Sequence, residues 1–181
     1  MSPTEPKPAE RAHAHRKEEA REVATTVITV SDTRTLETDT GGALVAEFLA
    51  AAGHPVAGRE IVSDERQAIQ AALRAALERD DVQAVILTGG TGVAPRDVTP
   101  ESVEPLLERL VPGFGELFRW LSYEDIGSAA LLSRALAGLS GGRVVFVIPG
   151  SRGAVRLAME KLILPEMGHL AAEAIKRPGP S

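Results

Sequence analysis

Polar or glycine-rich residues follow four predicted strands of this chain, and these strand exits are the places where chemistry could occur. In open α/β sheets, ligands bind beyond the carboxyl ends of the strands. The four exits should therefore meet at one edge of the sheet and form a single site there. They are Ser31 with Asp32, Ser63 with Asp64, the run Thr88, Gly89, Gly90, Thr91 and Gly92, and the turn Pro149, Gly150 and Ser151.

The glycine-rich run at 88–92 is the most informative of the exits. Glycines let backbone N–H groups approach an anion closely, and a helix N-terminus that follows adds favourable partial charge. The run is neither a Walker A loop, because no Gly-Lys-Ser/Thr follows, nor the dinucleotide-binding fingerprint. Spacing alone leaves two alternatives open: a phosphate-binding loop, or a tight turn that only joins a strand to the next segment.

Asp97 is a candidate metal ligand beside this run. Thr99 is expected to cap a helix with Pro100 at its first position, so the nearby carboxylate has no evident structural duty. Mg²⁺ prefers one or two carboxylates together with phosphate oxygens, which suits a carboxylate next to a phosphate-binding loop. The alternative is a solvated ion pair between Asp97 and Arg96, which would contribute little.

Asp64 and Ser133 carry weaker signals when judged from the residues alone. Ser63 or Asp64 could cap a helix that starts near Glu65, with Gln67 completing a capping pattern. Ser133 falls in a segment expected to be helical, where a serine is usually exposed or bonded back to its own helix. From spacing alone, capping is the better interpretation for Asp64, and Ser133 has no assigned role.

Alternating strands and helices are needed to bring these residues together. β-branched and apolar runs predict strands over 23–30, 55–62, 84–87 and 143–148. Apolar periodicity predicts helices around 45–52, 69–77, from 99 onward, 114–121, 129–136 and 155–162. This order predicts a three-layer, doubly wound, mostly parallel α/β sheet with helices on both faces.

The length of 181 residues allows one well-packed domain, expected over 23–177 with a short tail over 178–181. Residues 1–22 contain almost no large apolar side chains, so a flexible arm is expected there. The arm includes His13 and His15, which have no acidic or Cys partners at ligand spacing and are interpreted as solvated.

Composition limits the classes of partner. The net charge of −5 and the lack of a long basic face disfavour nucleic-acid binding, and six aromatic residues are too few for a base-stacking surface. The absence of cysteine excludes thiolate metal sites and a Cys nucleophile. No apolar run reaches the length of a membrane span, and no signal-peptide core is evident, so we expect no membrane partner and a cytoplasmic protein.

Five motifs in order resemble the MoaB/MogA family of molybdenum cofactor proteins, over roughly residues 22–176. They are Val-Ser-Asp-Thr at 30–33, the run at 88–92, Arg-Asp-Val-Thr-Pro-Glu at 96–101, a group typical of the MoaB branch at 113–119, 126–128 and 132–135, and Pro-Gly-Ser at 149–151. One such motif would be weak, whereas five in sequence with family-like spacing are a specific match.

The resemblance implies a molybdopterin-binding fold whose active members transfer AMP from ATP to the terminal phosphate of molybdopterin, with Mg²⁺. It also implies a homotrimer or homohexamer, and a transient contact with the molybdate-inserting enzyme. By motif, Asp64 and Asp97 match acidic active-site positions, and Ser133 matches a pterin-contacting serine. The turn at 149–153 departs from the family pattern at Ser151, Arg152 and Gly153, so the resemblance alone does not assign nucleotide contacts to this turn, which is a candidate because it is a strand exit.

These signals together predict a molybdopterin adenylyltransferase. Asp64 and Asp97 are the expected catalytic residues and Mg²⁺ ligands, and Arg134 or Arg152 could offset developing charge. The expected substrate-binding residues are Ser31, Asp32, Thr88, Gly89, Gly90, Thr91, Gly92, Ser133, Arg134, Pro149, Gly150 and Ser151. The alternative is a molybdopterin-binding or carrier protein without catalysis, against which the presence of both aspartates argues.

Most aromatic side chains fall in one short segment, 114–123. Aromatic residues are enriched in the cores of protein interfaces. This segment is therefore predicted to form a contact between subunits, and the alternative is that it packs locally in the core of its own domain.

Overall fold

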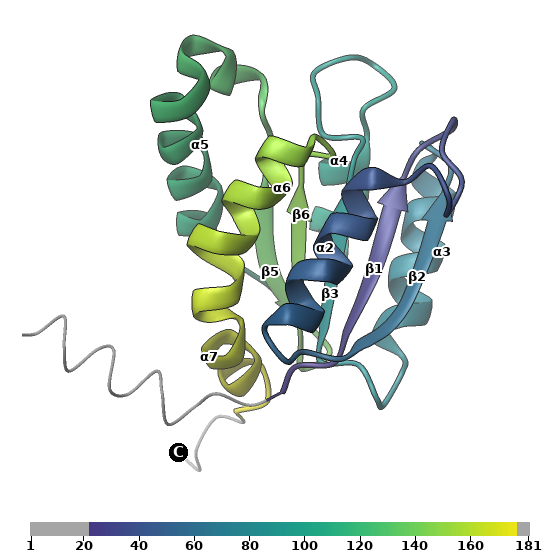
Figure 1. Cartoon of the computed structure of the whole chain (residues 1–181). Coiled ribbons are helices and arrows are strands. Elements are labelled where there is room, and N and C mark those ends of the chain that lie inside the picture. The colour runs from purple at the N-terminus through teal and green to yellow at the C-terminus, as the bar shows by residue number, and fades with distance from the viewer. Residues whose placement is uncertain (1–21, 177–181) are drawn as a thin grey trace, which may run out of the picture.

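A six-stranded sheet in the order β2-β1-β3-β6-β5-β4 forms the centre of the computed structural model, which describes residues 22–176 (Figure 1). The strands are β1 (Thr25–Val30), β2 (Val56–Val62), β3 (Ala84–Thr88), β4 (Arg109–Leu110), β5 (Leu136–Ser140) and β6 (Arg143–Ile148). β2, β1, β3 and β6 pair in parallel, whereas β5 and β4 are antiparallel additions at one side. The mostly parallel α/β sheet predicted from the sequence is thus confirmed.

The helices cover both faces of this sheet (Figure 1). They are α2 (Thr40–Ala51), α3 (Arg66–Leu77), α4 (Thr99–Val103), α5 (Pro112–Ile126), α6 (Arg152–Ala158) and α7 (Leu164–Ala174). Short 3-10 helices follow α4 and α5, namely η1 (Glu104–Leu106) and η2 (Gly127–Leu132), and the π-helix η3 (Met159–Ile163) joins α6 to α7. Pro165 lies in the first turn of α7, where its missing N–H is least costly.

Two apolar clusters, one on each face, hold the helices against the sheet. Alternate residues of the central strands point to opposite faces, so Ile86 joins one cluster and Val85 the other. The first cluster includes Phe118 of α5 and Val155 of α6, and the second is built around α3 and α4. β1 and β3 are buried along their whole length, which explains their continuous apolar or β-branched character.

The segment predicted as a helix over 129–136 is different in the structure. Its first part is the 3-10 helix η2, and a strand that the sequence analysis missed, β5, begins at its last residue, Leu136. Gly141 and Gly142 have φ values of 55° and 74°, and they form the tight turn that pairs β5 with β6. Two glycines between apolar runs are a hairpin signal that takes precedence over helical spacing here.

The arm expected over residues 1–22, with His13 and His15, and the tail over 178–181 lie outside the described residues, apart from Glu22, and both stay predictions. Within residues 22–176, no helix combines the length and the apolar character needed to cross a bilayer.

Candidate functional site

The strand exits meet at one edge of the sheet, where the carboxyl ends of β1, β3 and β6 lie next to one another (Figure 1). The backbone N–H of Gly89 donates to the carbonyl of Ile148 at 3.2 Å, which joins the exits of β3 and β6. The backbone N–H of Asp64 donates to Oδ1 of Asp32 at 2.9 Å, which joins the exits of β2 and β1. The four exits predicted from topology are therefore neighbours in the structure.

Gly89 and Gly90 form the sharp turn at the end of β3. Their φ values are 100° and 61°, in the left-handed region that other residues rarely adopt. A Cβ on Gly89 would collide with the carbonyl oxygen of Val30, and one on Gly90 would lie 2.5 Å from Oδ1 of Asp64 and still closer to Oγ1 of Thr99. The turn itself thus requires both glycines, whether or not the run binds phosphate.

Two buried oxygen atoms beside Gly90 have no hydrogen-bond partner, namely Oδ1 of Asp64 and Oγ1 of Thr99. The side chain of Asp64 is only 6% exposed, and Thr99 is completely buried. Leaving such a group unpaired costs about 1–3 kcal/mol, and more when it is charged. Unpaired buried groups are few in folded proteins and need an explanation, and a ligand or ion is one of the recognised explanations.

The capping roles predicted for these residues are wrong. The N-cap of α3 is Glu65, which makes no side-chain capping bond, so neither Ser63 nor Asp64 caps that helix. The N-cap of α4 is Val98, and Thr99 lies inside the helix without capping it. The first correction removes the structural duty that competed with the functional interpretation of Asp64. The second removes the reason for expecting Asp97 to have no structural duty, and its carboxylate does accept a hydrogen bond within a turn.

The charges around Asp64 make it a carboxylate that would be stabilised by a cation. Burial raises the pKa of Asp64, and the negative charges of Asp32 and Asp97 raise it further. Arg96 opposes this effect, with Nη2 3.9 Å from Oδ2 of Asp64, but its side chain is 66% exposed and the pairing is weak. Arg96 thus faces Asp64, and the alternative ion pair between Arg96 and Asp97 is not formed.

Asp97 closes a short turn next to the glycine run. Its Oδ2 accepts from the backbone N–H of Ala94 at 3.0 Å, and its own N–H donates to the carbonyl of Ala94 at 2.9 Å. A Cβ on Gly92 would lie 2.6 Å from the same Oδ2, so Gly92 lets the carboxylate pack directly against the main chain. These bonds fix the orientation of the Asp97 carboxylate, which lies close enough to Asp64 for its negative charge to raise the pKa of Asp64.

The other expected site residues are also at this edge but mostly support its turns. Oγ of Ser31 accepts from the N–H groups of Thr33 and Arg34, and Oγ of Ser151 accepts from the N–H of Ala154 at the start of α6. Oγ1 of Thr88 donates to the carbonyl of Pro149 at 3.3 Å. Ser133 is half-buried just before Arg134, whose guanidinium donates to the carbonyl of Thr91.

The donor set suits a magnesium ion that is held only in part by the protein. No group of three or more His, Asp or Glu side chains at metal-binding distance occurs within residues 22–176. The unpaired oxygen of Asp64, with Asp97 nearby, offers the one or two carboxylates that Mg²⁺ uses when phosphate oxygens and water supply its remaining ligands. The residues present therefore fit the ion together with a phosphate-bearing substrate.

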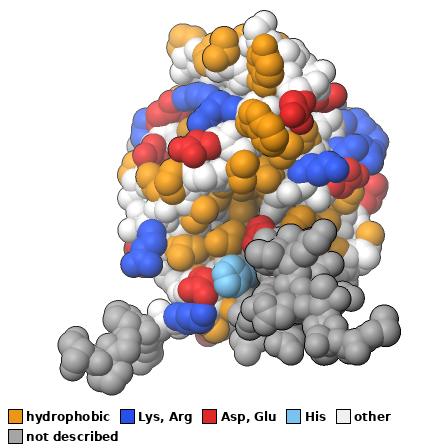
Figure 2. All heavy atoms as spheres, turned by 90° about the vertical axis from the view of Figure 1, so that its left-hand side faces the viewer, with side chains coloured by type: hydrophobic (Ala, Val, Ile, Leu, Met, Phe, Trp, Pro, Cys, Tyr) orange, Lys and Arg blue, Asp and Glu red, His pale blue; other side chains and the backbone are white. Residues whose placement is uncertain are grey.

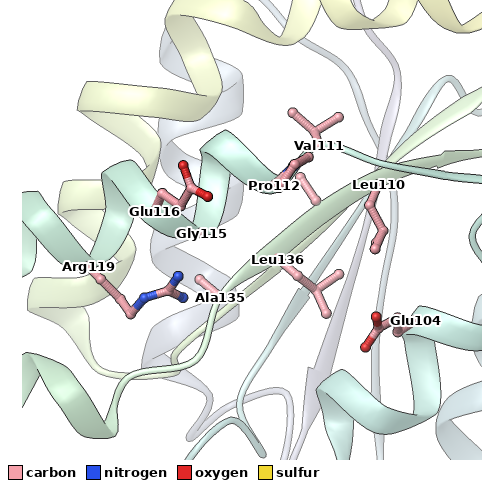
Figure 3. Close-up of a pocket in the computed structure, with 10 residues that line it drawn as sticks. Glu104, Leu110, Val111, Pro112, Gly115, Glu116, Arg119, Ala135 and Leu136 are labelled. Atoms are coloured by element: carbon pink, nitrogen blue, oxygen red, sulfur yellow. The ribbon is translucent and has the colours of Figure 1, made fainter.

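A cavity of about 210 Å³ adjoins the site on the side of β5, and neither aspartate lines it (Figure 3). Ala135, which follows Arg134, forms part of its wall together with Leu136, and Glu104, Glu116 and Arg119 place charged groups around it. Sequence reasoning did not single out Glu116 and Arg119, which line this cavity. The only signal was their place in the motif at 113–119 that resembled the MoaB branch.

The aromatic segment in α5 divides between core and surface. Phe114 and Phe118 are buried, and the ring of Phe114 lies 5.4 Å from that of Phe146. Leu117, Trp120 and Tyr123 are instead 50–62% exposed. Figure 2 shows hydrophobic side chains gathered on the face of the molecule that carries α5. Local core packing thus explains half of the segment and leaves the other half unexplained.

Comparison with known proteins gives a consistent assignment. Residues 26–169 match the family model described as a probable molybdopterin binding domain. Molybdenum cofactor biosynthesis protein B of Bacillus anthracis is 55% identical over 160 residues, which cover 88% of this chain and 95% of that protein. The protein of the same name from Bacillus subtilis (strain 168) is 53% identical over 163 residues, or 90% of this chain and 96% of that protein.

Solved structures agree with the sequence relatives. A crystal structure of molybdenum cofactor biosynthesis protein B matches with a TM-score of 0.85 and 54% identity, over 87% of this chain and 98% of that one. The tungsten cofactor synthesizing protein MoaB from Pyrococcus furiosus matches with a TM-score of 0.77 and 37% identity, over 87% of this chain and all of that one. The chain therefore belongs to the MoaB family of molybdenum cofactor biosynthesis proteins, built on a molybdopterin-binding domain.

Proposed function

We propose that this protein activates molybdopterin by transferring AMP from ATP to the terminal phosphate of the pterin. The observation that carries the proposal is the unpaired, buried Oδ1 of Asp64, which lies against the glycine turn with Asp97 close by. An enzyme that joins two polyanions needs cations, and a carboxylate that lacks a partner is where a divalent cation would be held.

The reaction requires no general base. An ionised phosphate oxygen of molybdopterin attacks the α-phosphorus of ATP, a new P–O bond forms, and the bond to the bridging oxygen breaks to release pyrophosphate. Catalysis of such a transfer depends on alignment of the reactants and on neutralisation of charge. The lack of a histidine at the site is therefore consistent with this chemistry.

Each part of the site has a role in the proposal. The backbone of residues 89–92 and the N-terminus of α6, which Ser151 caps, follow the ends of β3 and β6 at the edge where phosphates would bind. Asp64 and Asp97 would hold Mg²⁺, which when bound would neutralise phosphate charge between the two substrates. Arg96, exposed and close to Asp64, can turn toward a nucleotide phosphate without breaking a strong interaction.

We propose that the pterin ring binds in the 210 Å³ cavity, whose wall includes Ala135, two residues after Ser133. Its wall from Leu110 to Pro112 and at Leu136 offers apolar contact for a flat ring (Figure 3). One carboxylate can accept hydrogen bonds from the adjacent N–H donors of an aminopyrimidinone ring, and Glu116 supplies a carboxylate at this cavity (Figure 3). Replacing Glu116 with Gln should weaken binding of molybdopterin and leave ATP binding unchanged, as measured by calorimetry.

We also propose that the exposed side chains of Leu117, Trp120 and Tyr123 bury themselves against another copy of the chain, in a trimer or hexamer. Large contiguous apolar patches on a monomer often mark interaction surfaces. The expected contact with the molybdate-inserting enzyme stays a prediction.

The experiment that tests the function combines purified protein with molybdopterin, ATP and Mg²⁺. Release of pyrophosphate and formation of adenylylated molybdopterin are expected, and both should be lost in Asp64→Asn and Asp97→Asn. Asp80→Asn, which removes the same charge from a fully exposed position, is the matched control and should retain activity. Tight binding of molybdopterin without any pyrophosphate release would favour the alternative, a carrier that does not catalyse the transfer.

A further inference from the structure

Arg134 makes three hydrogen bonds that connect separate parts of the site. Its Nε donates to the carbonyl of Thr91 at 3.2 Å, and its Nη2 donates to the carbonyl of Asp97 at 2.7 Å. Its Nη1 donates to the carboxylate of Glu101 in α4. One guanidinium thus spans both ends of the segment 91–97 and the helix that follows it.

The segment 91–97 has little else to hold it in place. Val93 is 63% exposed at its tip, and Arg96 is exposed as well. Its internal bonds are those of the turn between Ala94 and Asp97, and these do not connect the segment to the rest of the domain. Besides the hydrogen bond from the Thr99 N–H to the carbonyl of Gly90 at its base and the weak pairing of Arg96 with Asp64, the bonds to Arg134 connect the segment that carries Asp97 to the protein body.

Glu101 is itself held firmly from the other side. Nη1 of Arg66 in α3 donates to the carbonyl of Glu101 at 2.6 Å, and the side chain of Gln70 donates to the carbonyl of Ser102 at 3.0 Å. Burial alone would raise the pKa of Glu101, but the hydrogen bond and charge of Arg134, with the charge of Arg66, leave the pKa below its ordinary value. Glu101 is thus a charged, fixed anchor for Arg134.

We infer that Arg134 is a positioning residue, which sets the place of Asp97 and the glycine run by clamping Thr91 and Asp97 to Glu101. This differs from the role expected from the sequence, in which Arg134 offset charge on the substrates. Because Arg134 directly follows Ser133, the clamp also connects the segment that we assign to the pterin with the segment that we assign to phosphate. The catalytic consequence rests on the proposed function, whereas the structural one does not.

The two roles for Arg134 predict different results for a lysine substitution. A charge-neutralising cation can be replaced by lysine with much of its effect kept, because the charge is the same. A clamp cannot be replaced in this way, since the compact ammonium group does not reach three acceptors arranged around a planar fork. Arg134→Lys should therefore be nearly as defective as Arg134→Ala.

Hydrogen exchange of the ligand-free protein tests the clamp independently of any activity. In Arg134→Ala and Arg134→Lys, the amides of residues 91–99 should exchange at least 10-fold faster, whereas amides of β3 and β6 should be unchanged. Arg74→Ala, which removes an exposed arginine from α3, is the matched control and should leave exchange at 91–99 as in the original protein. Unchanged exchange at 91–99 in both Arg134 variants would overturn the inference.

Kinetics of AMP transfer give the second readout. Misplacement of a catalytic group by about 1 Å can cost about 100-fold in rate, so kcat should fall by that order in both variants while KM for ATP changes much less. Recovery of most of kcat by lysine would overturn the positioning role in favour of charge neutralisation. If the original protein transfers no AMP, the proposed function fails, and the exchange experiment still decides whether Arg134 is a clamp.

Discussion

Asp64→Asn should make the ligand-free protein more stable at neutral pH, although it should abolish the proposed reaction. The carboxylate of Asp64 is 6% exposed, its Oδ1 has no hydrogen-bond partner, and Asp32 and Asp97 add negative charge nearby. The neutral amide keeps the shape of the side chain and removes the buried charge. Active sites commonly store instability of this kind.

The magnitude follows from the contacts of this side chain. An unpaired buried group costs about 1–3 kcal/mol, of which the neutral amide would still carry a part. Loss of the weak interaction with Arg96 subtracts about 0–1 kcal/mol. A net gain of about 1 kcal/mol remains, which for a domain of this size raises Tm by about 2–4 °C.

The pH dependence of stability tests separately whether Asp64→Asn stabilises the protein. Because the pKa of Asp64 is raised in the folded protein above its ordinary value of 3.8, the folded state binds more protons than the unfolded state in the window above pH 3.8. The original protein therefore loses stability as pH rises through this window, and the variant does not. The gain in Tm should be full at pH 8 and should shrink toward pH 4.

Thermal unfolding followed by circular dichroism at pH 8 and pH 4 is the assay. Asp80→Asn, at a fully exposed aspartate, removes the same charge and should change stability by less than about 0.5 kcal/mol. A variant that is less stable than the original protein at pH 8, or a gain equal to that of Asp80→Asn, would refute the reasoning about the buried carboxylate.

Three further predictions concern the turn, the first strand and the assembly. Gly90→Ala places a Cβ 2.5 Å from Oδ1 of Asp64 at a φ of 61°, so it should lower the free energy of unfolding in urea by about 1–3 kcal/mol. Gly153→Ala, at a helical position with open space around it, should leave this free energy unchanged or raise it slightly. Equal effects of the two substitutions would contradict the prediction. Burial lowers the pKa of His54, although the charge of Glu22 opposes the effect. The neutral ring accepts a hydrogen bond at Nδ1 from the N–H of Val23. The contribution of neutral His54 to stability is therefore complete above pH 6.5 and is lost as pH falls through the lowered pKa. His54→Gln should therefore be less sensitive than the original protein to a change from pH 8 to pH 5, measured as the urea midpoint, and an equal sensitivity would exclude His54 as the cause. Trp120→Glu, at a 60% exposed side chain, should reduce the molar mass measured by light scattering to that of a monomer without lowering the helix content, and an unchanged mass would remove this surface from the proposed assembly.

The periodicity of apolar residues in the sequence was sufficient to predict most of the strands and helices of the fold. The predicted strands at 55–62, 84–87 and 143–148 agree with β2, β3 and β6 within a residue at each end, and the strand at 23–30 begins two residues later, as β1. Long apolar runs of β-branched residues have few alternative structures, because only a buried strand uses both of their faces. The segment around β5 was mistaken for a helix, because short apolar runs fit either period and the pairing partner decides between them.

The residue types at the strand exits, and the fact that parallel strands place those exits at one edge, follow from the sequence alone. Only the tertiary structure decided which polar atoms are paired, because the partners are distant in the chain: Arg134 lies 43 residues from Thr91, and Asp64 lies 32 residues from Asp32. The unpaired oxygen of Asp64 and the clamp made by Arg134 are consequences of this packing. Local spacing encodes where a side chain sits on its own element, whereas burial and hydrogen bonding depend on what other elements bring against it.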